Sequence, residues 1–354
     1  MTDLTRRQAF FLAAGLPFAG AITCAGAITC AGAITCAGAA TSARAATQKI
    51  TVALDWTINT NHIGLFVARD KGFYRDAGLD VEILPYGDTG SGTLVANRVA
   101  DFGISGSLGL FTQKSAGADL KAVYAVVQSE TGRVVFNADR AAIKSPRNLD
   151  GLTYGGFGSA WENALISTII RHDGGKGDFS TVTLGTSAYE ALANGAVDFT
   201  LEVSTWEGVE AELKGLKQRS FRYADYGVPD EHTTLIVSSS AFLAANPKAA
   251  AAFVKATQRG YAFAVDHAQE AGDLLIAANK DTLTTPALVH ASLKALNDGH
   301  FLKSAQGVIG TMDKAKMEAM GSYLFASGIL LDGNGKALTA MPDFEAYYTN
   351  EFLG

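Results

Sequence analysis

Apolar runs of strand length alternate with helical patterns along residues 46–354, and this alternation predicts an α/β protein. The β-branched and aliphatic runs predict strands at 50–55, 80–84, 101–105, 121–127, 152–155, 181–184, 197–201 and 233–238. Helices with apolar core-facing stripes are predicted at 247–279, 286–298 and 312–327. Strand followed by helix throughout is typical of parallel sheets covered on both faces.

A loop after the first predicted strand holds the densest group of candidate binding side chains. We expect these at one mouth: Asp55, Trp56, Asn59, Asn61 and His62. The carboxyl ends of strands in open α/β sheets are where small molecules bind. Asn59 or Asn61 is well suited to cap the helix that follows. The alternative is that Trp56 packs in the core and that the Asn residues only cap.

Two distant segments of the chain resemble each other. LVANRVADFGIS (94–105) and ALANGAVDFTLE (191–202) share Ala-Asn, then Asp-Phe, then an aliphatic residue, all in register. Each indicates a helix end, a turn and a short strand. The match predicts two similar α/β lobes in which Ser105 and Glu202 occupy equivalent strand ends, unless it arose by chance in an alanine-rich chain.

The glycine-rich segment GGFGSAWENAL (155–165) predicts a close approach of the backbone to a ligand. We expect Ser159 to begin a helix whose free N–H groups favour an anion or a carbonyl. Glu162 is either a ligand contact or only a partner of the helix dipole. A phosphate-binding loop is the alternative, but the Lys-Ser/Thr ending of such loops is absent.

More carboxylates and aromatic side chains follow the predicted strand that precedes Glu202. Trp206 and Glu207 are expected on the first turn of the next helix. A flat heteroaromatic ligand is held by stacking on its faces and by charge-assisted hydrogen bonds at its edges. Trp56 and Trp206 are therefore the candidate stacking plates, and Tyr86 is a lesser candidate.

The first 45 residues have the features of a cleaved export signal. TRRQAFFL (5–12) resembles a twin-arginine motif, and no charged residue follows Arg7 until Arg44. The small residues of Ala43-Arg44-Ala45 permit cleavage before Ala46. The hexapeptide AITCAG occurs at 21–26, 27–32 and 33–38 and contains all three cysteines of the chain. We therefore expect a mature protein without disulfide or thiolate chemistry. A lipid anchor on one cysteine and a permanent membrane span are the alternatives, and the repeated glycines disfavour the span.

The charge and the motifs of the sequence argue against several classes of function. A formal net charge of −6 with no Lys/Arg run argues against a nucleic-acid surface. The six histidines are scattered, and no metal-ligand or Ser-His-Asp pattern is present. Small molecules or proteins are the expected partners, and we expect no catalytic residue, metal or cofactor.

Several of these segments together resemble the NMT1/THI5-like (SsuA/THI5-like) solute-binding proteins, relatives of bacterial receptors for thiamine-pyrimidine precursors. The resemblance is carried by residues 54–83, by GLTYGGFGSAWENAL (151–165), by WEGVEAELKG (206–215) and by YTNEFL (348–353). It implies a type II periplasmic binding protein, a monomer that delivers its ligand to the permease and ATPase of an ABC importer. The ligand it implies is a pyrimidine of the hydroxymethylpyrimidine or formylaminopyrimidine type. Riboflavin or a sulfonate is the alternative ligand.

The two-lobe fold places a ligand cleft between the lobes and a hinge where the chain crosses twice. We expect the crossings near 136–141 and 237–240. Lobe 1 then comprises 46–138 and 239–354, and lobe 2 comprises 139–238, after the signal segment 1–45.

The alternative from another class is the fungal pyrimidine synthase, which shares the fold. The resemblance implies that a synthase carries a lysine for pyridoxal phosphate, a histidine donor and a cysteine cluster. Ser105 stands where the lysine would fall, Gly109 stands at the place of the histidine, and the region 231–247 lacks cysteine. An amine is needed to form an imine with the cofactor aldehyde, so the sequence favours a receptor over a synthase.

Overall fold

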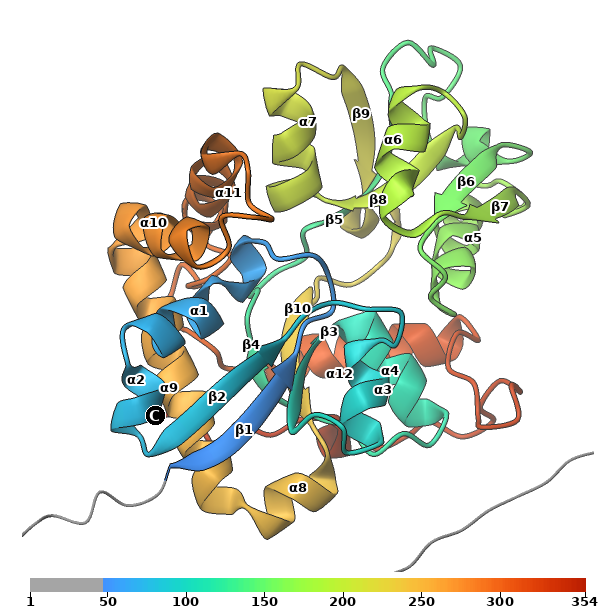
Figure 1. Cartoon of the computed structure of the whole chain (residues 1–354). Coiled ribbons are helices and arrows are strands. Elements are labelled where there is room, and N and C mark those ends of the chain that lie inside the picture. The colour runs from blue at the N-terminus through green and yellow to red at the C-terminus, as the bar shows by residue number, and fades with distance from the viewer. Residues whose placement is uncertain (1–46) are drawn as a thin grey trace, which may run out of the picture. The chain divides into compact units, whose positions relative to one another are not determined.

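Two five-stranded sheets organise residues 47–354, the part of the chain that this computed structural model describes (Figure 1). Sheet A has the order β2-β1-β3-β10-β4, with β1 (Gln48–Ala53), β2 (Leu79–Leu84), β3 (Phe102–Gly106), β4 (Lys121–Ala125) and β10 (Thr234–Ser238). Sheet B has the order β7-β6-β8-β5-β9, with β5 (Gly132–Asn137), β6 (Thr153–Gly156), β7 (Ser180–Thr183), β8 (Phe199–Val203) and β9 (Gln218–Arg222). Each sheet is the centre of one lobe, so the predicted two-lobe α/β architecture is confirmed.

Helices cover both sheets. Lobe 1 carries α1 (Ile63–Asp70), α2 (Phe73–Asp76), α3 (Ser91–Ala96), α4 (Ser107–Ser115), α8 (Ser240–Ala245), α9 (Pro247–Asp266), α10 (Ala268–Ala278), α11 (Pro286–Asp298) and α12 (Lys314–Ala326). Lobe 2 carries α5 (Glu162–His172), α6 (Ala188–Ala193) and α7 (Val209–Leu213). Short helical turns form η1 (Thr60–His62), η2 (Pro146–Leu149), η3 (Gly185–Ser187), η4 (Ser204–Gly208), η5 (Tyr223–Tyr226) and η6 (Phe344–Tyr347). Helix α11 reaches across to α7 and η4 of lobe 2.

The internal resemblance of the sequence is confirmed in space. β3 and β8 are each the central strand of their sheet, with a parallel neighbour on one side and an antiparallel one on the other. The Asp before each strand accepts a backbone N–H from the parallel neighbour, Asp101 from Thr51 and Asp198 from Thr153, both at 2.8 Å. The two lobes therefore repeat one supersecondary plan.

The crossings between the lobes lie earlier than the sequence predicted. β5 belongs to sheet B, so the chain leaves lobe 1 within 126–131 and not near 136–141. β10 belongs to sheet A, so the chain returns within 223–233 and not near 237–240. Both errors have one cause, because an apolar strand has the same pattern in either sheet and its partner is set by long-range pairing.

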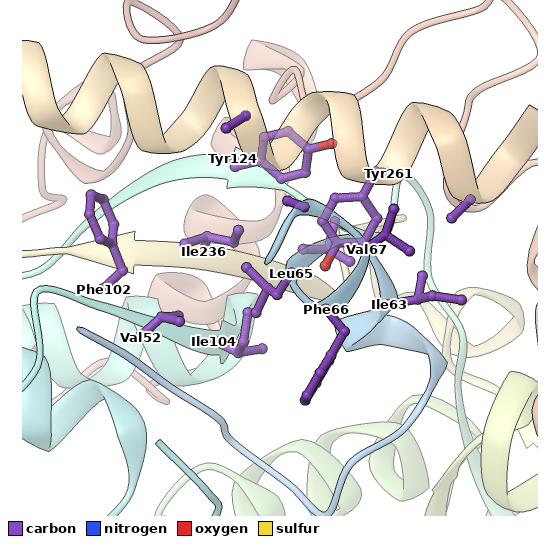
Figure 2. Packing of buried hydrophobic residues seen from close by; sticks show 14 of the residues in the cluster. Val52, Ile63, Leu65, Phe66, Val67, Phe102, Ile104, Tyr124, Ile236 and Tyr261 are labelled. Carbon is purple, nitrogen blue, oxygen red and sulfur yellow. The ribbon is translucent and has the colours of Figure 1, made fainter. Parts of the chain in front are cut away.

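The core of lobe 1 fixes the loop that carries the first group of candidate residues. Helix α1 packs on α9 so closely that a Cβ on Gly260 would overlap the backbone carbonyl oxygen of Gly64. Tyr261 follows Gly260, stacks on Tyr124 at a centroid distance of 5.4 Å, and lies within the buried cluster shown in Figure 2. Its hydroxyl donates to the backbone oxygen of Asn61 at 2.6 Å. The core thus holds the start of α1 directly.

The proposed export features, including Arg6, Arg7 and the AITCAG repeats, lie outside the described residues. Within 47–354, no helix combines the length and the apolar character that a membrane crossing needs.

Candidate ligand-binding site

A cavity of about 460 Å³ lies between the two lobes, within the size range of small-molecule sites. Its wall includes every residue singled out from the sequence: Asp55, Trp56, Asn59, Asn61, His62, Tyr86, Ser105, Ser159, Glu162, Glu202, Trp206 and Glu207. The structure therefore brings the candidates from both lobes together. Their individual roles in binding stay predictions, and their hydrogen bonds indicate which of them are free to meet a ligand.

The loop after β1 is a self-supporting turn. Asn59 caps the short turn η1, which leads directly into α1, by accepting the N–H of Asn61 at 2.8 Å, while α1 itself begins after His62 with no side-chain cap. His62 accepts the Asn59 N–H at Nδ1, and its Nε2 lies 3.0 Å from an oxygen of Asp55. An imidazole that accepts at Nδ1 carries its proton on Nε2, so His62 donates to Asp55 and holds that carboxylate at the cavity mouth.

Trp56 is the central aromatic residue of the cavity. Its ring lies 5.3 Å from the ring of Tyr86 and 5.5 Å from that of Phe157, which belongs to lobe 2. Its indole N–H donates to Oε1 of Glu207 at 3.1 Å, again across the cleft. Trp56 is half-buried, so part of its ring remains available for stacking.

Trp206 has a different environment from Trp56. It is 8% exposed and belongs to the same hydrophobic cluster as Phe253 and Leu293 of lobe 1. Although it lines the cavity, most of its surface is used in packing. The alternative interpretation for Trp56, that the side chain packs in the core, thus describes Trp206 better.

Ser159 and Glu162 correct the expectation for the glycine-rich segment. The helix begins at Glu162 and not at Ser159. Glu162 accepts the N–H of Ser159 at 2.6 Å, the N–H of Phe157 at 2.9 Å and the hydroxyl of Tyr154 at 2.7 Å. A carboxylate with three donors holds the loop in shape and fixes the position of Phe157 at the cavity, while a ligand contact of Glu162 stays a prediction.

Glu202 and Glu207 differ in whether their carboxyl oxygens already have hydrogen-bond partners. Glu207 accepts the indole N–H of Trp56 and the backbone N–H of Val203 at 3.2 Å, so both of its oxygens have partners. Glu202 is 9% exposed and lines the cavity, and no hydrogen bond to its side chain is found within residues 47–354. Glu202 is therefore the free acceptor, and Glu207 orients Trp56.

The wall of the cavity is acidic. It carries six carboxyl groups, those of Asp55, Asp88, Glu162, Glu202, Glu207 and Glu231. No Lys or Arg side chain is among the described residues that form the wall. Such a surface favours ligands that donate hydrogen bonds or carry positive charge, and disfavours anions.

Burial changes the acidity of these groups. It raises the pKa of Glu202 and of Glu207 to about 7, and the nearby Arg133 opposes this rise at Glu202. Among residues 47–354, no group of three or more His, Cys, Asp or Glu side chains is placed to hold a metal ion.

We expect the ligand-free protein to lose stability as the pH rises from 5 to 7. Glu130, Glu202 and Glu207 have a pKa of about 7 when folded and near 4.5 when unfolded, so in this window the unfolded state releases protons that the folded state keeps. The burial of His232 lowers its pKa to about 4 and acts oppositely, but it is one group against three. The net fall in unfolding free energy should be about 2 kcal/mol or more. Urea unfolding at pH 5 and pH 7 measures it, and stability that rises over this range would contradict the assignment.

Several wall residues were missed from the sequence. Phe157 lies in the glycine-rich segment and could have been found as the apolar residue between its glycines. Tyr189, Tyr223 and Glu231 also line the cavity. They come from α6 and from the second crossing, and no local pattern marks these positions as facing a cleft.

Comparisons with known proteins agree with this geometry. Residues 59–271 match the family described as NMT1/THI5 like. The chain belongs to this family. The resemblance noted from the sequence is thereby confirmed.

Similar proteins include both binding proteins and enzymes. A formylaminopyrimidine-binding protein of Halalkalibacterium halodurans is 27% identical over 79% of this chain and 85% of its own. A 4-amino-5-hydroxymethyl-2-methylpyrimidine phosphate synthase of Candida albicans is 23% identical over 63% of this chain and 69% of its own. The periplasmic aliphatic sulphonate binding protein SsuA of Escherichia coli superposes with a TM-score of 0.60 at 16% identity, covering 86% of this chain and 99% of that one. The predicted type II periplasmic binding protein fold is thus confirmed.

Proposed function

We propose that this NMT1/THI5-like protein is the solute-binding component of an ABC importer. Its ligand is a flat, donor-rich heterocycle of the thiamine-precursor pyrimidine class, hydroxymethylpyrimidine or formylaminopyrimidine. The observation that carries the proposal is the acidic, aromatic cavity wall with Glu202 free and Trp56 half-buried. The similarity to a formylaminopyrimidine-binding protein supports the same ligand class.

The mechanism follows from the position of the cavity between two lobes that are joined by the crossing segments 126–131 and 223–233 and by contacts of α11. A ring stacked on Trp56 from lobe 1 and bonded to Glu202 from lobe 2 favours the closed arrangement over an open one. The indole of Trp56 already reaches Glu207 across the cleft. Closure presents the surface that a permease recognises, and we expect a monomer to suffice.

A sulfonate is the first alternative ligand, because proteins of similar fold bind sulfonates. A sulfonate is an anion and needs cations or a set of free backbone N–H groups. The wall residues include neither Lys nor Arg, and the N–H groups of Phe157 and Ser159 are taken by Glu162. Riboflavin, the other alternative, also requires donors for its ring carbonyls, which this acidic wall supplies poorly.

A pyrimidine synthase is the alternative from another class. Ser105, at the position expected for the cofactor lysine, donates its hydroxyl to the Gly106 carbonyl at 3.1 Å, and Gly109 lies beside it on α4. A hydroxyl cannot form the imine that pyridoxal phosphate chemistry needs. We therefore infer a receptor that needs no cofactor.

One experiment separates receptor from synthase. The protein is incubated with pyridoxal phosphate and iron, and pyrimidine release is followed by mass spectrometry, while native mass spectrometry of protein purified from its own periplasm identifies any bound ligand. We expect a bound pyrimidine in the second measurement and no product in the first. Release of a pyrimidine with loss of a histidine side chain would establish a synthase instead.

Export to the periplasm, by the twin-arginine route and with cleavage before Ala46, is part of the same proposal. Its support is the sequence of residues 1–45 and the periplasmic location of the similar Escherichia coli protein. N-terminal sequencing of periplasmic material tests it, and retention of the AITCAG repeats would refute the cleavage position.

A further inference from the structure

Glu231 is a buried residue of the cavity wall, and one oxygen of its carboxyl group is unpaired among the described residues. It lies on the second crossing segment, is 3% exposed, and lines the cavity. Its Oε2 atom is buried, and within the described residues it has no hydrogen-bond partner. Buried polar atoms are almost always paired in folded proteins, so a carboxyl group that lines a cavity and has an unpaired oxygen marks a place where a ligand supplies a partner.

The free protein tolerates this group because of its surroundings. Burial, together with the nearby carboxylates of Glu130 and Asp230, raises the pKa of Glu231 well above its usual value. This shift favours the uncharged form of the group, which lowers the cost of burying it. The other carboxyls nearby are occupied, because Glu130 pairs with Arg133 and Asp230 with Lys316.

The segment that carries Glu231 also ties the two crossings together. Thr131 donates its N–H to the hydroxyl of Thr233 at 2.9 Å, and that hydroxyl donates to the carbonyl of Ser129 at 3.1 Å. The N–H of Glu130 donates to Asp230 at 2.8 Å. A ligand atom that binds Glu231 thus touches the hinge itself, where small movements change the angle between the lobes.

We propose that Glu231 is a ligand-binding residue whose carboxyl group accepts an N–H from the ligand at the hinge. The inference rests on the proposed function and makes it more specific. The ligand must present two separate donor groups, one to Glu202 of lobe 2 and one to Glu231 on the crossing segment. An aminopyrimidine with a second amino or amide N–H on its side arm has this chemistry, whereas a ring with one donor does not.

Calorimetric titration of formylaminopyrimidine into the wild-type protein and Glu231→Gln tests the inference. We expect the variant to bind about tenfold more weakly, because an amide nitrogen that cannot accept a hydrogen bond replaces one carboxyl oxygen, and to unfold at the same or a higher temperature. Glu231→Asp keeps the carboxyl group but shortens the side chain by one methylene, so its affinity for the ligand should also fall. This second variant tests the inference if Glu231→Gln does not fold.

Glu130→Gln is the matched control, since it removes a buried acid from the other crossing segment, outside the cavity wall. Its affinity should stay within about twofold of the wild type. Equal losses in Glu130→Gln and Glu231→Gln would indicate a general disturbance of the hinge and overturn the inference. Unchanged binding by Glu231→Gln would overturn it and leave the proposed function intact, whereas no binding by the wild type would overturn both.

Discussion

Glu202→Gln is expected to bind formylaminopyrimidine about ten- to a hundredfold more weakly than the wild-type protein. Glu202 is the wall carboxylate of lobe 2 whose oxygens have no donor among residues 47–354, so a ligand N–H is the partner it is placed to accept. A hydrogen bond to a charged acceptor contributes about 1.5 to 3 kcal/mol, and each 1.4 kcal/mol is about a factor of ten in affinity. Glutamine keeps the shape of the side chain and removes the charge, so the change should appear in binding and not in folding.

The control for this prediction is Glu212→Gln. Glu212 is exposed and close enough to Glu202 to influence its pKa, but it does not line the cavity. Calorimetric titration should give an affinity within about twofold of the wild type. If both variants lost the same affinity, the effect of Glu202 would be a long-range charge effect and not a contact.

Gly260→Leu is expected to lower the free energy of unfolding by about 3 kcal/mol or more. Overpacking a core costs about 1 to 3 kcal/mol when side chains can move aside. Here the first obstacle is the backbone oxygen of Gly64 on α1, with Ala68 next to it, and a backbone carbonyl cannot change rotamer. Separation of α9 from α1 would also move Tyr261 and the Asn61 carbonyl that it holds, so the site loop should be disturbed as well.

Lys255→Leu provides the comparison, because it places the same side chain at an exposed position of α9. Its unfolding free energy should lie within about 0.5 kcal/mol of the wild type. Urea unfolding followed by circular dichroism measures both variants. A stable Gly260→Leu protein with wild-type affinity would show that the contact between α1 and α9 is not what holds the loop.

Local patterns were sufficient for much of the fold. The strands around Val52, Ile104 and Ile236 are short apolar runs, and all three lie in the buried cluster of lobe 1. The Asp-Phe match was informative because the Asp makes the same contact in both lobes. Its carboxylate accepts a backbone N–H from the neighbouring parallel strand. Residues at the carboxyl ends of strands, such as Glu202 in β8, could be assigned to the cavity because ligands bind at these ends in open α/β sheets.

The remaining features depend on contacts between distant segments. The sequence cannot tell that Glu162 accepts hydrogen bonds from two loop N–H groups and from the Tyr154 hydroxyl on β6. Nor can it tell that Trp206 packs against lobe 1 beside α11. β5 was missed as a separate strand, and β9 is a mostly exposed edge strand with a polar sequence, so its pattern is weak. Glu231 follows no motif, and only the folded crossing segments bring it to the cavity.

The central claim is that this cavity binds a donor-rich pyrimidine and not an anion. Calorimetric titration of the mature protein with formylaminopyrimidine, and in parallel with an alkanesulfonate, tests it most directly. The acidic wall predicts one-to-one binding of the pyrimidine and no measurable binding of the sulfonate. Tight sulfonate binding with no response to the pyrimidine would contradict the account.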